Sequence, residues 1–292
     1  MVERAITYKN IVRDYVLLTK PGIVILVLIT TLTGMYLSKK GFPDPWLILW
    51  TLLGTGLASS GSAVLNQFFD RDIDALMSRT KDRPLPSGNL SPINALLFGI
   101  ILLFTSLYIM ITFVNALATF FTAMAAFFYV FVYTIALKRK SPLATEIGGI
   151  SGALPPVIGY TAVASKFGFE PLILFLIMFV WQPPHFWVLA IKYAEDYKKA
   201  GIPTLPVARG IEQTKIKTLL YTASLLPISL LPTLYGISGN VYFFTAFALS
   251  SLYLILTFKF LFSKDAKAMF LFFYSIVYLA FLFSVMVFDM AK

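Results

Sequence analysis

The chain has 292 residues, of which 58% are hydrophobic and only 13% charged, a balance that excludes an ordinary soluble domain with its roughly 25% of charged residues. Cysteine is absent, which excludes disulfides, thiolate metal sites and cysteine nucleophiles. The net charge of +10 does not indicate nucleic-acid binding, because the cations lie in short loops between apolar segments, where membrane topology and anionic lipid headgroups account for them.

Apolar segments long enough to cross a membrane recur along the whole chain, since a span needs about 20 residues. Residues 1–20 are polar and mixed in charge, so no signal peptide is expected and the first apolar segment can direct insertion. The sequence therefore predicts one all-α polytopic membrane domain over residues 1–292, embedded in the lipid bilayer. We expect nine spans, at 22–38, 46–68, 92–112, 115–137, 144–164, 171–191, 216–235, 239–261 and 268–288.

Two pairs of prolines fall inside these spans. Pro155-Pro156 lies in the fifth span and Pro183-Pro184 in the sixth. Proline removes a backbone donor and clashes with the preceding turn, so each pair should kink or break its helix. Membrane proteins tolerate such breaks where protein or water in a cavity satisfies the freed carbonyl groups.

Lysine and arginine are distributed unevenly between the two sides of the expected bundle. With the N-terminus inside, the inner segments hold 20 of the 24 basic residues and the outer segments hold 4. This bias predicts a cytoplasmic N-terminus in the cell membrane, and an odd number of spans then puts the C-terminus outside. Two long loops, 69–90 and 192–215, fall on the cytoplasmic side.

The most distinctive segment is Asn66-Gln-Phe-Phe-Asp70-Arg-Asp72-Ile-Asp74, at the end of the second span. Asn66, Asp70 and Asp74 are four residues apart, so a helix places them on one face. Three oxygen ligands on one face suit Mg²⁺ shared with a polyphosphate, and acids at a membrane face usually have a function. We therefore predict a magnesium site here; a polar cluster that only holds the loop is the alternative.

Asp72 lies about 200° around the helix from Asp70. It should face away from the metal site, as a solvated partner of Arg71 or Lys81. Cations follow the aspartates at Arg79, Lys81 and Arg83, and such residues bind the phosphate charge that a metal leaves uncompensated.

The second cytoplasmic loop carries another charged cluster, Lys192-Tyr-Ala-Glu195-Asp196-Tyr197-Lys198-Lys199. If it faces the first cluster, two Mg²⁺ ions could clamp one diphosphate. An ordinary juxtamembrane run of charges is the alternative. Lys138, at the end of the fourth span, and Lys20, before the first, could likewise bind phosphate or only anchor the chain at the inner face.

The single histidine, His185, follows the second proline pair between Trp181 and Trp187. Imidazole can bind heme iron, donate to a carboxylate or carry protons; a structural histidine inside the bundle is the alternative. The glycines of Gly148-Gly149-Ile-Ser-Gly152 allow close helix packing or the close approach of a flat ligand, and packing is the reading that the glycines alone favour.

Together these segments resemble the UbiA-type intramembrane prenyltransferases. The first aspartate motif of that superfamily is similar to Asn66-x-x-x-Asp70-x-x-x-Asp74 followed by Arg79 and Arg83-Pro84. The resemblance runs from about residue 20 to 210 and fades over the last three spans. A second Asp-x-x-x-Asp motif, which many members carry, is replaced here by Glu195-Asp196. The chain most resembles the branch that farnesylates protoheme IX, on the segments Gly148-Gly149-x-x-Gly152-Ala-x-Pro155-Pro156, Pro184-His185-Phe186-Trp187 and Asp196-Tyr197-x-x-Ala-Gly201-Ile-Pro203.

The resemblance implies nine helices around a central cavity that the two cytoplasmic loops cap. It implies transfer of a farnesyl group from farnesyl diphosphate to a vinyl group of protoheme IX, with Mg²⁺ as cofactor. The product, heme O, would serve heme–copper terminal oxidases, and heme A synthase or oxidase assembly factors would be partners. The implied residues are Asn66, Asp70, Asp74 and Asp196 for catalysis and metal; Lys20, Arg79, Arg83, Lys138, Lys192 and Lys199 for diphosphate; and His185, Trp181 and Trp187 for heme.

Two other functions stay open at this point. The chain could prenylate a quinone precursor or a glycerol lipid, polar-headed acceptors that should not need His185. A cation-coupled transporter would use Asp70 and Asp74 as ion ligands. However, transporter acids usually lie near the bilayer midplane, whereas these lie at the end of a span beside arginines.

Overall fold

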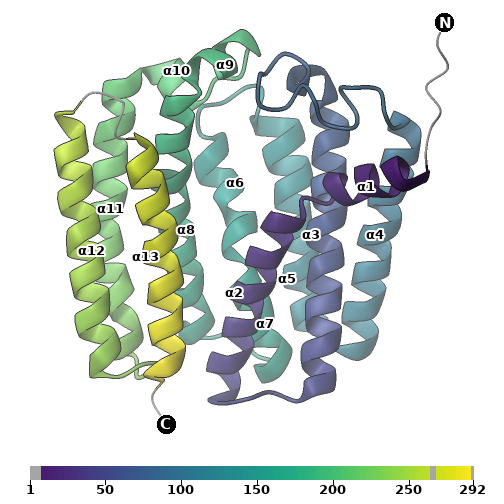
Figure 1. Ribbon diagram of the computed structural model, residues 1–292. Helices are drawn as coiled ribbons and strands as arrows, with labels where there is room; N and C mark the ends of the chain where they lie inside the picture. The colour runs from purple at the N-terminus through teal and green to yellow at the C-terminus, as the bar shows by residue number, and fades with distance from the viewer. Residues whose placement is uncertain (1–7, 264–267, 291–292) are drawn as a thin grey trace, which may run out of the picture.

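A computed structural model describes residues 8–263 and 268–290 as a single bundle of helices joined by short loops (Figure 1). The long helices stand side by side, and α1 lies across one end of them. The helices are α1 (Tyr8–Leu18), α2 (Pro21–Lys39), α3 (Pro45–Asp74), α4 (Pro92–Phe113), α5 (Ala116–Phe127), the π-helix η1 (Phe128–Leu137), α6 (Ala144–Ala153), α7 (Pro155–Ala164), α8 (Phe169–Lys192), α9 (Ala194–Lys199), α10 (Leu205–Arg209), α11 (Ile211–Leu234), α12 (Asn240–Leu261) and α13 (Ala268–Phe288).

The predicted all-α membrane fold is confirmed. Within the described residues, eight helical segments are long and apolar enough to cross a membrane: α2, α3, α4, α5 with η1, α6 with α7, α8, α12 and α13. The ninth predicted span, 216–235, corresponds to α11, which has 24 residues and packs against α8 and α12. It is less apolar than the other eight because its first turns carry Glu212, Lys215 and Lys217.

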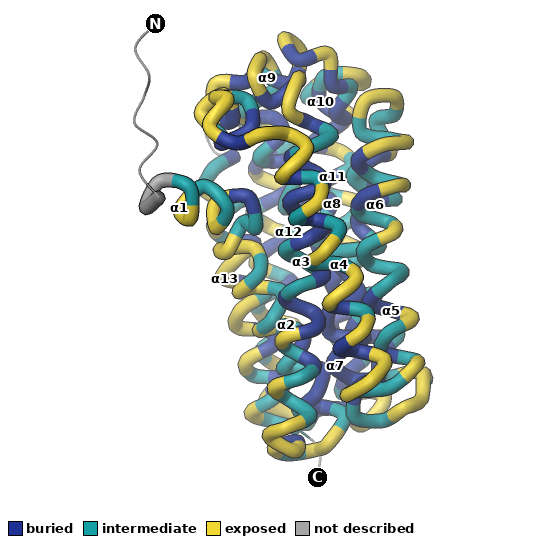
Figure 2. Tube along the Cα trace, turned by 90° about the vertical axis from the view of Figure 1, so that its right-hand side faces the viewer, coloured by how far each residue is buried: buried dark blue, intermediate teal, exposed yellow. Residues whose placement is uncertain are grey.

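Large apolar side chains cover the outside of the bundle. Exposed residues line the outer sides of the long helices, while buried residues face their neighbours (Figure 2). Phe104 is 71% exposed, and Phe244 is 69% exposed. Such a surface is unfavourable in water and suits a chain surrounded by lipid tails.

The two proline pairs have different effects. α6 ends at Ala153 and α7 begins at Pro155, so the fifth span consists of two half-helices, as predicted. α8 continues through Pro183 and Pro184 without interruption, so the sixth span is not broken. Beside these prolines, the side-chain amide of Gln182 donates to the carbonyl oxygens of Gly149 and Met178, at 2.9 and 3.1 Å. These bonds hold α8 against α6 and support the helix at this point.

Glycines allow the closest contacts between helices. A Cβ on Gly159 of α7 would lie 1.8 Å from the backbone oxygen of Thr31 on α2. A Cβ on Gly148 of α6 would lie 2.5 Å from the ring of Tyr133 on η1. Small residues let membrane helices approach in this way, so the packing reading of the glycines fits the structure.

The loops that were expected to be functional lie at one end of the bundle. α3 extends to Asp74, so the loop predicted over 69–90 begins at residue 75. Both this loop and the short helices α9 and α10 lie at the end that carries α1, whereas α13 ends at the opposite side (Figure 1). Ile73 and Met77 pack with Tyr197 and Ile202 in one apolar cluster. The two loop regions therefore pack against each other.

Candidate active site

The three predicted metal ligands share one face near the loop end of α3. Asn66, Asp70 and Asp74 are 3%, 0% and 3% exposed. The side-chain nitrogen of Asn66 donates to Oδ2 of Asp70 at 2.7 Å. The four-residue spacing thus produces one continuous polar face, as an α-helix requires.

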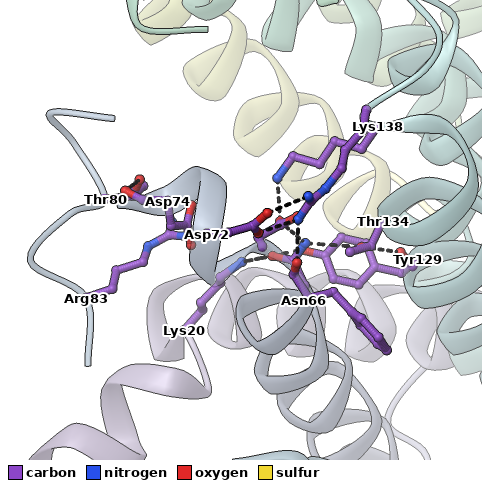
Figure 3. Close-up of polar contacts among 12 residues, drawn as sticks. Lys20, Asn66, Asp72, Asp74, Thr80, Arg83, Tyr129, Thr134 and Lys138 are labelled. Carbon is purple, nitrogen blue, oxygen red and sulfur yellow. Dashed lines mark hydrogen bonds and ion pairs between the residues drawn. The ribbon is translucent and has the colours of Figure 1, made fainter. Parts of the chain in front are cut away.

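A cation from a different element contacts each of these three side chains, and Figure 3 shows those at Asn66 and Asp74. Nζ of Lys20, between α1 and α2, donates to Oδ1 of Asn66 at 2.7 Å. Lys138, which follows η1, forms an ion pair with Oδ2 of Asp70. Arg83, in the loop after α3, donates to Oδ2 of Asp74 at 2.6 Å. Three cations face two carboxylates, so the site carries surplus positive charge of the kind that binds phosphate.

Lys20 is held in an unusual backbone conformation. Its φ of 52° is left-handed, a region that costs an ordinary residue roughly 1–3 kcal/mol and is found at functional sites. Burial, together with the positive charges of Arg83 and Lys138, lowers the pKa of Lys20 to about 7. A bound anion would favour the charged form of this lysine.

Asp70 leaves an oxygen ligand free. Its Oδ1 is buried and has no hydrogen-bond partner, and an unsatisfied buried acceptor costs about 1–3 kcal/mol. Within residues 8–263 and 268–290, no group of three or more His, Asp and Glu could hold a metal. Mg²⁺ therefore fits this site only with the amide oxygen of Asn66 and phosphate oxygens completing the ligands of Asp70 and Asp74, which is its usual preference.

The π-helix η1 supplies two contacts that the sequence did not predict. Oγ1 of Thr134 accepts from the side-chain nitrogen of Asn66 at 3.1 Å and donates to the carbonyl oxygen of Tyr129 at 2.8 Å. The hydroxyl of Tyr129 lies 3.5 Å from Nζ of Lys20. The one hint of these contacts in the sequence is the pair Tyr129 and Tyr133, four residues apart and shortly before Lys138.

Asp72 faces away from the site, but its partner differs from the prediction. Both of its carboxylate oxygens accept from Arg139, at 2.6 and 2.7 Å, and the Asp72 side chain is largely exposed while that of Arg139 is about one-third exposed. The prediction of Arg71 or Lys81 is wrong, because the end of η1 lies beside the end of α3 and brings Arg139 closer. Arg71 instead donates to the carbonyl oxygen of Phe68.

Arg79 and Asp196 have other partners than the three cations do. Asp196, on α9, accepts a hydrogen bond from the hydroxyl of Ser78. The guanidinium of Arg79 lies 5.8 Å from the centre of the Tyr193 ring. Lys192 and Lys199 are exposed. In the described part of the chain, Asp70 forms its ion pair with Lys138 and Asp74 with Arg83, and none of these four residues joins them.

His185 is held between aromatic rings on the side of α8 that faces α13. Trp181 and Phe272 stack on its two faces, each with a centroid distance of 4.5 Å. Its Nδ1 lies 2.7 Å from Oγ of Ser275. Trp187 is fully buried and contacts Tyr221 of α11 instead. The structure therefore brings Trp181 to His185 but keeps Trp187 away from it.

Comparisons with known proteins place the whole chain beside the prenyltransferases that the aspartate motif resembles. Residues 27–285 match the model of the UbiA prenyltransferase family. Protoheme IX farnesyltransferase of Aquifex aeolicus is 60% identical over 292 residues, which cover all of both chains. Protoheme IX farnesyltransferase of Neorickettsia sennetsu is 43% identical over 282 residues, covering 96% of this chain and 93% of the relative.

Solved structures share the fold at low sequence identity. A digeranylgeranylglyceryl phosphate synthase structure is 22% identical, with a TM-score of 0.82 over 95% of this chain and 98% of that one. A UbiA homologue from Archaeoglobus fulgidus bound to DMAPP and Mg²⁺ is 19% identical, with a TM-score of 0.63 over 94% and 99%. With the buried Asn–Asp face on α3 and the family match over most of its length, the chain belongs to the UbiA prenyltransferase family.

Proposed function

We propose that this chain transfers a farnesyl group from farnesyl diphosphate to a vinyl group of protoheme IX, giving heme O and diphosphate. The observation that carries this proposal is the 60% identity, over the full length, to the Protoheme IX farnesyltransferase of Aquifex aeolicus. The cations around Asp70 and Asp74 support the diphosphate half of the reaction, and His185 supports the heme half. The product would serve heme–copper oxidase assembly.

Asp70, Asp74 and Asn66 would hold Mg²⁺, and the free Oδ1 of Asp70 is the observation in favour of this role. When bound, Mg²⁺ would act as a Lewis acid on the leaving diphosphate. Oδ1 of Asn66 accepts from Lys20 in this structure, so Lys20 would turn from the amide to the phosphate. Asp196 accepts from Ser78 through Oδ2, so it would join the metal site through Oδ1 or by releasing Ser78.

Lys20, Arg83 and Lys138 would take the charge of the diphosphate. Their positions are set by three different elements, so negative charge would develop on the leaving group against cations that are already in place. Arg79, Lys192 and Lys199 lie outside this group, near the same end of the bundle, where they would attract an anionic substrate.

The transfer has a simple balance of bonds. The bond between C1 of the farnesyl group and the diphosphate oxygen breaks, and C1 forms a carbon–carbon bond with the heme vinyl group. Water then adds to the resulting cation, its oxygen becomes the hydroxyl of heme O, and its remaining proton leaves to solvent. His185 would contact the heme and hold it, with Trp181 fixing the plane of the imidazole.

We place the reaction on the cytoplasmic side of the membrane. The support is the excess of Lys and Arg on one side, 20 against 4, because basic loops stay in the cytoplasm. The loop that follows α3 and the α9–α10 region would then cap the site from that side.

The deciding experiment is expression of the chain in cells with a heme source, followed by extraction of the pigment and mass analysis. The expected result is heme O, with only protoheme from a matched Asp70→Asn strain. Prenylation of a quinone precursor or glycerol lipid, without heme O, would overturn the heme assignment. Ion uptake into proteoliposomes without diphosphate release would overturn the enzyme assignment.

A further inference from the structure

We infer that Ser275 is a positioning residue for heme recognition, because it determines which ring nitrogen of His185 carries the proton. The inference rests on the proposed function, since it takes protoheme as the ligand. Ser275 lies on α13, which packs against α8 (Figure 1). It belongs to the last three spans, for which the sequence predicted no functional residue.

The hydroxyl of Ser275 is fully buried, with two hydrogen-bond partners and the Tyr253 hydroxyl close by. It donates to the carbonyl oxygen of Phe272, one turn earlier in α13, at 2.6 Å. Nδ1 of His185 lies 2.7 Å from the same oxygen. A serine hydroxyl has one hydrogen but can accept through its lone pairs. Because that hydrogen is directed to Phe272, the serine oxygen accepts from His185, and Nδ1 must carry the ring proton.

A neutral imidazole protonated on Nδ1 has its lone pair on Nε2. Among the hydrogen bonds of the described residues, His185 uses Nδ1 only. Histidines that bind metals usually donate their other N–H to a fixed acceptor, which selects the tautomer and the orientation of the ring. Ser275 occupies the place of this acceptor, so the lone pair of Nε2 would be available to bind heme iron.

The orientation of the imidazole is fixed by the same residue. The rings of Trp181 and Phe272 lie at 18° and 24° to the imidazole plane, one on each face. The indole N–H of Trp181 donates to the backbone oxygen of Ser275 at 2.9 Å. The backbone of Ser275 therefore holds one stacking ring and its side chain holds the imidazole, so rotating His185 would break several contacts together.

The test is titration of the purified full-length protein with protoheme, followed by its absorption spectrum. Wild type should show histidine-ligated heme, and His185→Ala should lose it. Ser275→Ala should weaken heme affinity by about 10-fold or more, the usual effect of removing a group that orients a metal ligand. Ser275→Thr, which keeps the hydroxyl, should restore both affinity and spectrum.

Ser229→Ala is the matched control. Ser229, on α11, is also fully buried, donates to the carbonyl oxygen of Leu226 three residues earlier and bonds Ser250 on the next helix. The Ser229→Ala variant loses the same kinds of hydrogen bond, but Ser229 does not contact His185. The heme spectrum of this variant should therefore match that of wild type. Thermal stabilisation by Mg²⁺ and a non-hydrolysable farnesyl diphosphate analogue should be unchanged in Ser275→Ala.

The outcomes separate this inference from the proposed function. A wild-type heme affinity and spectrum in Ser275→Ala, with ligation lost in His185→Ala, would overturn the role of Ser275 alone. Loss of analogue binding in Ser275→Ala, or an equal heme defect in Ser229→Ala, would mean that Ser275 is only structural. An unchanged heme spectrum in His185→Ala would overturn the inference. The proposed function is tested separately, by whether the wild-type chain forms heme O.

Discussion

Replacing Asp70 by asparagine removes one charge at the centre of the site with almost no change in volume. Asp70 is fully buried, its Oδ2 contacts Asn66 and Lys138, and its Oδ1 is free. An asparagine would keep the shape but would be a weaker magnesium ligand, and it would leave the ammonium of Lys138 without its carboxylate.

The expected loss follows from these contacts. Removing one group that stabilises transition-state charge costs about 10²–10³ in rate, or roughly 2.7–4 kcal/mol. Breaking a buried ion pair can also cost about 3–5 kcal/mol of stability. This is an upper limit, because the Lys138 side chain is 16% exposed and can reach solvent. For Asp72→Asn the ion pair with Arg139 is 62% and 37% exposed, so about 0–1 kcal/mol is expected.

The assay measures diphosphate release and heme O formation by purified variants at saturating Mg²⁺ and substrates. Asp70→Asn should be at least about 100-fold slower than wild type, and Asp72→Asn less than about 5-fold slower. Thermal unfolding in the same detergent should show that both variants are folded. An Asp70→Asn rate within tenfold of wild type, or an Asp72→Asn rate as low as that of Asp70→Asn, would refute the metal-site reasoning.

Three further predictions concern the cations, the packing and the topology. Lys20→Met should raise the KM for farnesyl diphosphate by about 10–100-fold, since a hydrogen bond to a charged group contributes about 1.5–3 kcal/mol, and an unchanged KM would exclude the contact. Gly159→Ala should lower the thermal unfolding midpoint because its Cβ would meet Thr31 at 1.8 Å, whereas Gly22→Ala, with nothing within 4 Å, should not. Cysteines at Ser87 and Lys198, both exposed, should resist an impermeant thiol reagent in intact cells and react in inverted vesicles; labelling of either from outside would reverse the topology.

Features with a local cause could be predicted from the sequence. The spans follow from apolar runs of the length that a bilayer requires. Asn66, Asp70 and Asp74 share a face because the α-helical period alone decides this. The break at Pro155 likewise depends on a residue that cannot continue a helix.

Features that depend on packing between distant segments could not be predicted. Arg139 pairs with Asp72 because η1 ends beside α3, and no spacing in the chain indicates this. α8 continues through Pro183 and Pro184, where contacts with neighbouring helices outweigh the local preference. Ser275 is one of many small polar residues in apolar spans, and only the packing of α13 on α8 gives it a partner in His185.

The winding of η1 explains why Lys138 reaches the site. Tyr129 and Lys138 are nine residues apart, so in an α-helix, at about 100° per residue, they would lie on opposite sides. A π-helix closes i→i+5 bonds and has about 4.4 residues per turn, which brings both to nearly the same side. The backbone N–H of Lys138 donates to the carbonyl oxygen of Tyr133, five residues earlier, at 2.8 Å. The wider helix therefore lets Lys138 contact Asp70 while the Tyr129 hydroxyl faces Lys20. The π-helical winding of η1 is thus the reason that Lys138 joins Lys20 and Arg83 at the polar face of α3.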